Sequence, residues 1–228
     1  MPHTLTHRRG FLANLAAGAA GLTLLGNPLR LNAAPAPARG EKPGDPDAWF
    51  SQIKGKHRMI LDVPRPHEIL PFVWPRVFLL TNMATGTPEK DNNVVVVLRH
   101  EGIPYAFEDR IWAKYKLGEL FKIDDAKTKA PSTRNPFWKP APGDYTVPGI
   151  GNVDIGIDQL QASGVLFCVC DAAMTVYSAA VAAGMNADPA EIKKDWMAGL
   201  LPGIQPMPSG IWAVGRAQEH GCSYCFAG

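Results

Sequence analysis

The stretch from Gly164 to Gly184 constrains the fold more than any other part of the sequence. Val165–Val169 is a short apolar run, typical of a buried strand in a parallel sheet. Ala172–Ala183 follows as a segment of small residues that predicts a helix ending at Gly184. Cys170 then lies at the turn between strand and helix, at the edge where open α/β sheets bind their ligands.

The position of Cys170 predicts a reactive thiol. A thiol at the start of a helix feels the positive end of the helix dipole, which favours the thiolate. The carboxylate of Asp171 opposes this if it lies close to the thiol, unless it caps the helix instead. Cys168 lies two residues deeper in the strand, so we expect Cys170 to react first. The alternative is that Cys170 only packs in the interior, as buried cysteines often do.

The first 34 residues predict an export signal. Arg8 and Arg9 precede an apolar stretch of about 14 residues, a pattern that resembles a twin-arginine (Tat) signal. This stretch is shorter than the roughly 20 residues that a membrane span needs, and both Ala33–Ala34 and Ala36–Ala38 offer cleavage sites. We therefore expect export to the periplasm, with the Tat translocase as a partner. The mature chain is expected to contain a flexible linker over 35–47 and one domain over 48–228.

Charge and composition exclude several classes of function. Of the 23 basic and 21 acidic residues, three arginines leave with the signal, so the mature chain is close to neutral. A nucleic-acid partner is therefore not expected. The hydrophobic content of 46% is ordinary for a globular domain, and no later run is long and apolar enough to span a membrane. Phosphate-binding glycine loops, paired catalytic carboxylates and a serine triad are not recognisable.

The remaining chain predicts further strands and helices around the Gly164–Gly184 unit. Asn93–Leu98 is the clearest strand, and its continuous β-branched residues place it at the centre of the sheet. His100 follows directly, so parallel strands would bring it to the same edge as Cys170. Further strands are expected at His57–Val63, Ile204–Met207 and Cys222–Phe226, and helices at Ala48–Ile53, His67–Met83, Tyr105–Phe121 (or a helix with a loop), Val153–Ser163, Asp188–Leu200 and Ile211–Glu219.

Residues 124–152 form an inserted loop in the predicted domain. The segment is rich in Pro, Lys, Asn and Gly, and it carries the aromatic residues Phe137, Trp138 and Tyr145. Its roughly 30 residues exceed an ordinary connection between elements. We expect either a lid over the site or a contact between subunits.

The four cysteines are Cys168, Cys170, Cys222 and Cys225. In an oxidising periplasm they allow three fully paired connectivities, although Cys168 and Cys170 are poor partners because they lie two apart in one strand. Cys222 and Cys225 predict a redox-active pair or a shared metal site. A C-x-x-C pair alone is half of a zinc site, and here it lacks the following His that covalent haem attachment needs.

Four segments resemble the DsrE/DsrF-like family, small α/β proteins linked to sulfur handling. They are Val97–Gly102, Leu160–Val165 before Cys170, Met207–Ile211 and Arg216–Tyr224. The resemblance covers about His57 to Phe226 and implies a three-layer α/β sandwich with a mostly parallel central sheet of about five strands. The 124–152 insertion and the Cys222/Cys225 pair depart from the family pattern.

The resemblance implies a function in sulfur transfer. In members of known role, the cysteine matching Cys170 looks like a carrier of sulfane sulfur as a persulfide, which implies a sulfurtransferase-like protein with a sulfur donor and acceptor as partners. His100, if it lies across the crevice, would accept or return the proton. The alternative is a non-catalytic, homo-oligomeric module that binds a small ligand, or copper on Cys170, Met174 and His100. No other cofactor is indicated.

Overall fold

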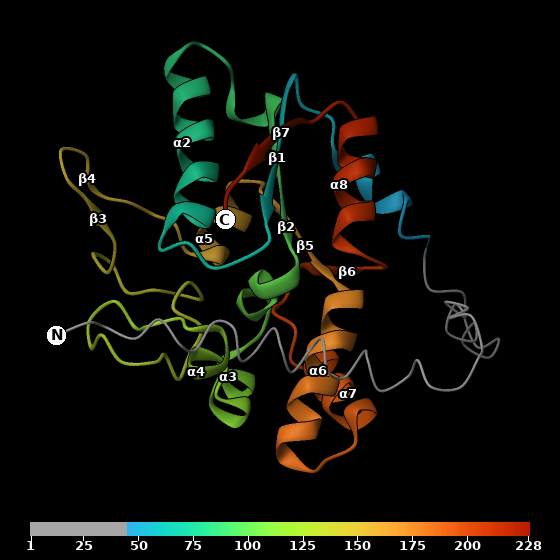
Figure 1. The fold of residues 1–228 in the computed structure, drawn as a ribbon. Helices are drawn as coiled ribbons and strands as arrows, with labels where there is room; N and C mark the ends of the chain where they lie inside the picture. Colours follow the sequence, from blue (N-terminus) through green and yellow to red (C-terminus); the bar gives the residue numbers. More distant parts are fainter. Residues whose placement is uncertain (1–44) are drawn as a thin grey trace, which may run out of the picture. The chain divides into compact units, whose positions relative to one another are not determined.

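The computed structural model describes residues 45–228. The predicted signal over 1–34, with Arg8 and Arg9, lies outside these residues, as does most of the predicted linker. The described chain is an α/β domain around a five-stranded sheet in the order β6-β5-β2-β1-β7, in which every neighbouring pair is parallel (Figure 1). The predicted fold class is confirmed. No helix within 45–228 has the length and apolarity that a membrane crossing requires.

The strands follow the hydrophobic pattern of the sequence closely. The central position of β2 was predicted from its run of valines, and Val94–Leu98 are fully buried. The strand of the Gly164–Gly184 unit is shifted by one residue, so that it includes Cys170. The bounds are β1 His57–Val63, β2 Asn92–Leu98, β5 Leu166–Cys170, β6 Ile204–Met207 and β7 Ser223–Phe226.

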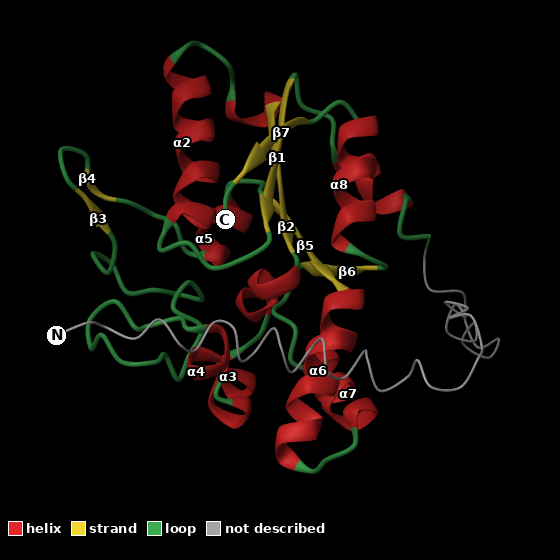
Figure 2. Cartoon of the chain, in the orientation of Figure 1, coloured by secondary structure: helices red, strands yellow, loops and turns green. Residues whose placement is uncertain are grey.

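Helices cover both faces of the sheet (Figure 2). Phe72 of α2 packs in the larger apolar cluster with Val94 and Val96, whereas Ala213 of α8 packs in the smaller cluster with Val95. Alternate residues of β2 therefore face opposite layers, as the two-residue period of a strand requires. The elements are η1 Ala48–Gln52, α2 Leu70–Ala84, η2 Glu89–Asp91, η3 His100–Ala106, α3 Asp109–Tyr115, α4 Leu117–Phe121, α5 Ile157–Ala162, α6 Asp171–Met185, α7 Pro189–Ala198 and α8 Gly210–Glu219.

Two helix starts follow the predicted capping chemistry. Asp188 accepts a hydrogen bond from the backbone N–H of Ala190 at 2.8 Å, with Pro189 in the first turn of α7. Ser209 caps α8 in the same way, through the N–H of Trp212 at 3.1 Å. These local signals are confirmed because each depends only on residues within one helical turn.

Other helix bounds differ from the prediction. α6 continues through Gly184 and ends at Met185, with Asn186 as its C-cap in the left-handed conformation (φ +49°), so the predicted stop at Gly184 is wrong. The segment Tyr105–Phe121 divides into the end of η3 and the short helices α3 and α4, because Lys116 between them is also left-handed. α5 begins at Ile157, four residues later than predicted.

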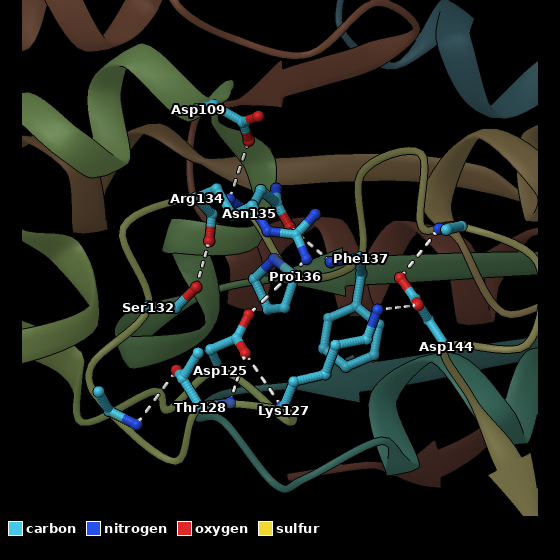
Figure 3. Close-up of polar contacts among 12 residues, drawn as sticks. Asp109, Asp125, Lys127, Thr128, Ser132, Arg134, Asn135, Pro136, Phe137 and Asp144 are labelled. Atoms are coloured by element: carbon cyan, nitrogen blue, oxygen red, sulfur yellow. Dashed lines mark hydrogen bonds and ion pairs between the residues drawn. The ribbon is translucent and has the colours of Figure 1, made fainter.

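The 124–152 insertion is anchored to the domain by buried groups (Figure 3). The side-chain amide of Asn135 donates to the carbonyls of Tyr105 and Phe107, each at 2.9 Å, and its backbone N–H donates to Asp109. The ring of Phe137 stacks on Phe72 of α2, with 4.1 Å between ring centroids. The insertion ends in a small antiparallel hairpin, β3 Thr146–Val147 and β4 Gly151–Asn152. These contacts hold the insertion against the face of the domain that α2 covers.

Candidate functional site

The carboxyl ends of β5 and β6 meet at Cys170 and Met207, which are register partners. The helix after β5, α6, packs in the same apolar cluster as α2, whereas the helix after β6, α8, covers the opposite face (Figure 1). Adjacent strands whose following helices diverge in this way mark the topological switch point, the position at which open α/β sheets bind ligands. This edge is the candidate functional site.

Cys170 is the N-cap of α6. Its Sγ accepts a hydrogen bond from the backbone N–H of Ala173 at 3.2 Å. Ser, Thr, Asp and Asn are preferred at this position, because their side-chain oxygens accept hydrogen bonds from the first backbone N–H groups of the helix. A thiol here places its sulfur at the positive end of the helix dipole, which favours a negative charge. The predicted location is therefore confirmed. The side chain is more buried than the prediction of a crevice-exposed thiol, since Cys170 is only 6% exposed.

Asp171 is the first residue of α6 and does not cap the helix. Its carboxylate pairs with the ammonium of Lys193 on α7 at 2.8 Å. The alternative that Asp171 binds the free amides is wrong, because Cys170 itself occupies that position. The positive charge of Lys193 offsets the negative charge that Asp171 brings to the neighbourhood of the thiol.

A polar cluster that the sequence analysis missed also lies at this edge. The guanidinium of Arg99, directly after β2, donates to both carboxylate oxygens of Asp62 on β1, at 2.6 and 2.8 Å. Tyr224 of β7 donates its hydroxyl to the same carboxylate at 2.8 Å. We call these three residues the edge cluster. The edge cluster combines residues from three segments that are distant in the sequence, so no local motif predicts it. The one signal in the sequence was an Asp inside an otherwise apolar strand.

Arg99 is the charged residue beside Cys170. Continuing the β2–β5 register one step past Leu98 and Val169 places the two residues next to each other. The hydrogen bond to Asp62 raises the pKa of Arg99 against the opposing effect of burial, and the nearby Cys170 thiol adds to the rise. A side chain at Gly210, the first residue of α8, would clash with the stem of Arg99. The guanidinium is thus held charged between β1 and α8.

His100 reaches the same edge of the sheet, as predicted, but contacts a different part of α6. Its Nδ1 lies 3.3 Å from the hydroxyl of Tyr177, two helical turns beyond Cys170. Burial raises the pKa of Tyr177, and the charge of Glu101 raises it further. Of the two residues that follow β2, Arg99 rather than His100 is therefore the one whose charge acts on Cys170.

The other three cysteines lie in two different layers of the domain. Cys168 is fully buried under α8, and burial raises its pKa; Cys222 lies in the same cluster, where burial raises its pKa to about 11. Cys225, three residues further in an extended segment, packs toward the opposite layer. The predicted Cys222/Cys225 disulfide or metal site would need the edge strand to rearrange, and all four thiols are free. Met174 is fully buried.

Residues 45–228 contain no group of three or more His, Cys, Asp or Glu side chains placed to hold a metal ion.

The chain was also compared with known proteins. No family model matches it, and no curated protein matches it. Among solved structures, a protein of unknown function from Methanobacterium thermoautotrophicum is similar at a TM-score of 0.37 and 15% identity, over 75% of this chain and 98% of that chain. A likeness at this level carries no functional argument.

Proposed function

We propose that this chain is a DsrE/DsrF-like sulfur carrier that holds sulfane sulfur as a persulfide on Cys170. The observation that carries the proposal is the hydrogen bond from the Ala173 N–H to Cys170 Sγ at the start of α6. A donor at this position stabilises a sulfur anion, whether thiolate or persulfide. The fixed positive charge of Arg99 beside the thiol acts in the same direction.

The proposed reaction is a thiol exchange that needs no further oxidant or reductant. The Cys170 thiolate attacks the outer sulfur of a donor R–S–SH, the bond between the two donor sulfurs breaks, and the donor leaves as R–S⁻. Cys170 then carries the outer sulfur as Cys170–S–SH. An acceptor thiolate removes that sulfur by the same step and regenerates the Cys170 thiolate.

The burial of Cys170 narrows the class of donor. With the thiol only 6% exposed, we expect inorganic polysulfide to load it faster than a folded protein that carries a persulfide.

We also propose that the chain acts in the periplasm, on the basis of Arg8 and Arg9. Replacing both with Lys should abolish export through the Tat translocase. Undiminished periplasmic protein in the double variant would point to another export route.

The test of the sulfur carrier is mass spectrometry of the reduced chain after treatment with polysulfide. We expect an increment of about 32 daltons, one sulfur atom, that maps to the peptide containing Cys170. The increment should disappear in Cys170→Ser and persist in Cys225→Ser, the matched control at a partly exposed thiol. An increment that survives in Cys170→Ser would contradict the proposal.

A non-catalytic binding module of the same fold is the second candidate, and the burial of Cys170 favours it. In that function the thiol only caps α6, a role that Ser fills at least as well. Cys170→Ser would then leave both ligand binding and stability intact, whereas a sulfur carrier would lose its activity at unchanged stability. For either function we propose a homo-oligomer, because α2 leaves Trp74, Leu80 and Met83 exposed.

A further inference from the structure

A cavity of about 620 Å³ lies between the start of α2 and the 124–152 insertion. Its lining includes neither Cys170 nor any member of the edge cluster. Ile69, Ile123 and the rings of Tyr105, Phe137 and Tyr145 form its apolar wall. The rings of Phe137 and Tyr145 are nearly parallel, with an interplanar angle of 10° and 5.0 Å between centroids. Volume and lining are those of a small-molecule site.

Five charged side chains also line this cavity. Asp125 pairs with Arg134 and accepts hydrogen bonds from the backbone N–H groups of Lys127 and Thr128. The other four, Glu68, Lys122, Asp124 and Lys129, are exposed to solvent. Within the described part of the chain, none of the four forms an ion pair or a side-chain hydrogen bond, with each other or with any other residue. Of the five charges around the cavity, two positive and two negative ones therefore have no direct partner. The hydroxyl of Tyr105 also has no hydrogen-bond partner in residues 45–228.

The backbone around the cavity is strained where the charges are attached. Glu68, Lys122 and Lys129 are left-handed, with φ of +47°, +55° and +58°. Such residues are uncommon outside glycine and cluster at ligand sites. Of the seven non-glycine residues with positive φ in the described chain, these three line the same cavity. The hydrogen bonds from the Asn135 side chain to the carbonyls of Tyr105 and Phe107 hold the insertion against η3 and the residue that follows it. Figure 3 shows the further bond from the Asn135 backbone to Asp109.

We infer that this cavity binds a small zwitterion with a flat apolar body, of the class of the aromatic α-amino acids. The ring of the ligand lies against Ile69, Ile123 and Tyr145, because Phe72 and Tyr145 already cover the two faces of the Phe137 ring. Its carboxylate is held by Lys122 and Lys129, and its ammonium by Glu68. Separated charges of both signs around an aromatic wall select this class over a simple anion, a simple cation or an apolar molecule.

The first test is calorimetric titration of the full chain with four related probes. L-phenylalanine carries all three features, whereas phenylacetate lacks the ammonium, phenethylamine lacks the carboxylate and glycine lacks the ring. We expect L-phenylalanine to bind at least tenfold more tightly than each of the others. No binding of L-phenylalanine at millimolar concentration, or equal binding of phenylacetate, would overturn the inference.

The second test uses a matched pair of variants. Lys122→Asn removes a charge from the cavity and keeps a residue that tolerates the left-handed backbone. Lys116→Asn makes the same change at another left-handed lysine that does not line the cavity. We expect Lys122→Asn to weaken L-phenylalanine binding at least tenfold and Lys116→Asn to leave it unchanged. Equal effects of the two variants, or no loss in Lys122→Asn, would contradict the proposed site.

Discussion

Two clusters in this chain use the same chemistry in different surroundings. In each, an aspartate accepts hydrogen bonds from an arginine and a tyrosine; the edge cluster is Asp62, Arg99 and Tyr224, and the surface cluster, between α3 and α7, is Asp195, Arg110, Lys114 and Tyr115. The side chain of Asp62 is 3% exposed and that of Arg99 22%, against 21% for Asp195 and 46% for Arg110. Burial therefore separates the two clusters, although their hydrogen bonds look alike.

The difference in burial determines how strongly each cluster acts on the reactivity of a neighbouring group. Solvent screens the exposed charges of the surface cluster, so their field falls off within a short distance. The charge of Arg99 lies in a less polar setting beside a thiol at a helix N-terminus, where the same charge has a stronger effect. We therefore expect the surface cluster to contribute modest stability and the edge cluster to contribute both stability and reactivity.

Removing the edge carboxylate should have the largest effect. Asp62→Asn leaves the guanidinium of Arg99 partly buried without its counter-charge, a change that typically costs about 3 to 5 kcal/mol of unfolding free energy. Because Arg99 keeps some access to water, we expect the lower end of that range. Chemical denaturation of the variant and the wild type measures the difference. A loss below about 1 kcal/mol would place the edge cluster in the same class as an exposed pair.

Removing both charges of the edge pair together should separate stability from reactivity. The double variant Asp62→Asn/Arg99→Met leaves no unpaired charge, so it should be far more stable than Asp62→Asn alone. Met also keeps an apolar stem against Gly210. We expect sulfur loading of Cys170 to slow about tenfold, equivalent to about 1.4 kcal/mol.

The control for the double variant is Arg110→Met, which removes an arginine from the surface cluster. It should load sulfur at the wild-type rate in the same time course of mass spectra. Wild-type loading by the double variant would show that Arg99 does not act on the thiol, while the persulfide itself could still form on Cys170.

The surface cluster provides the smaller stability effect. Asp195→Asn removes the negative charge that pairs with Arg110 and Lys114, whose side chains are about half exposed. Exposed pairs contribute about 1 kcal/mol or less, so the loss should stay within that limit. The same denaturation experiment, with Asp62→Asn beside it, gives the comparison directly. Equal losses of unfolding free energy in the two variants would show that burial does not separate the two clusters.

Local signals in the sequence predicted much of the fold. The valines of β2, the cap at Asp188 and the turn at Cys170 each depend on a few neighbouring residues, and the structure confirms them. The edge cluster was not predictable in this way, because it forms only when the strand order brings β1, β2 and β7 together. The end of α6 was missed because Asn186 adopts the backbone conformation for which glycine was expected.

The candidate site was predicted in position but not in composition. Cys170 and His100 lie at the expected edge, since both follow parallel strands. Their partners depend on side-chain directions across the sheet, which a single sequence does not show. The same reason explains why the predicted pairing of Cys222 and Cys225 does not match the structure. The two residues are three apart in an extended segment, so their side chains point to opposite layers.

The smallest predicted effect is a pH dependence confined to the surface cluster. Burial alone would raise the pKa of Asp195, but the hydrogen bonds from Lys114, Arg110 and Tyr115 outweigh it and hold the pKa well below its usual value. A carboxyl group with a lowered pKa in the folded state stabilises the fold above its unfolded pKa of about 4 and loses that contribution as the pH falls further. The stability difference between wild type and Asp195→Asn should therefore shrink between pH 5 and pH 3. Urea denaturation at pH 5, 4 and 3 measures this change, which cannot exceed the roughly 1 kcal/mol of the exposed pair. A difference that stays constant or grows toward pH 3 would mean that hydrogen-bond geometry, rather than charge, accounts for the contribution of Asp195.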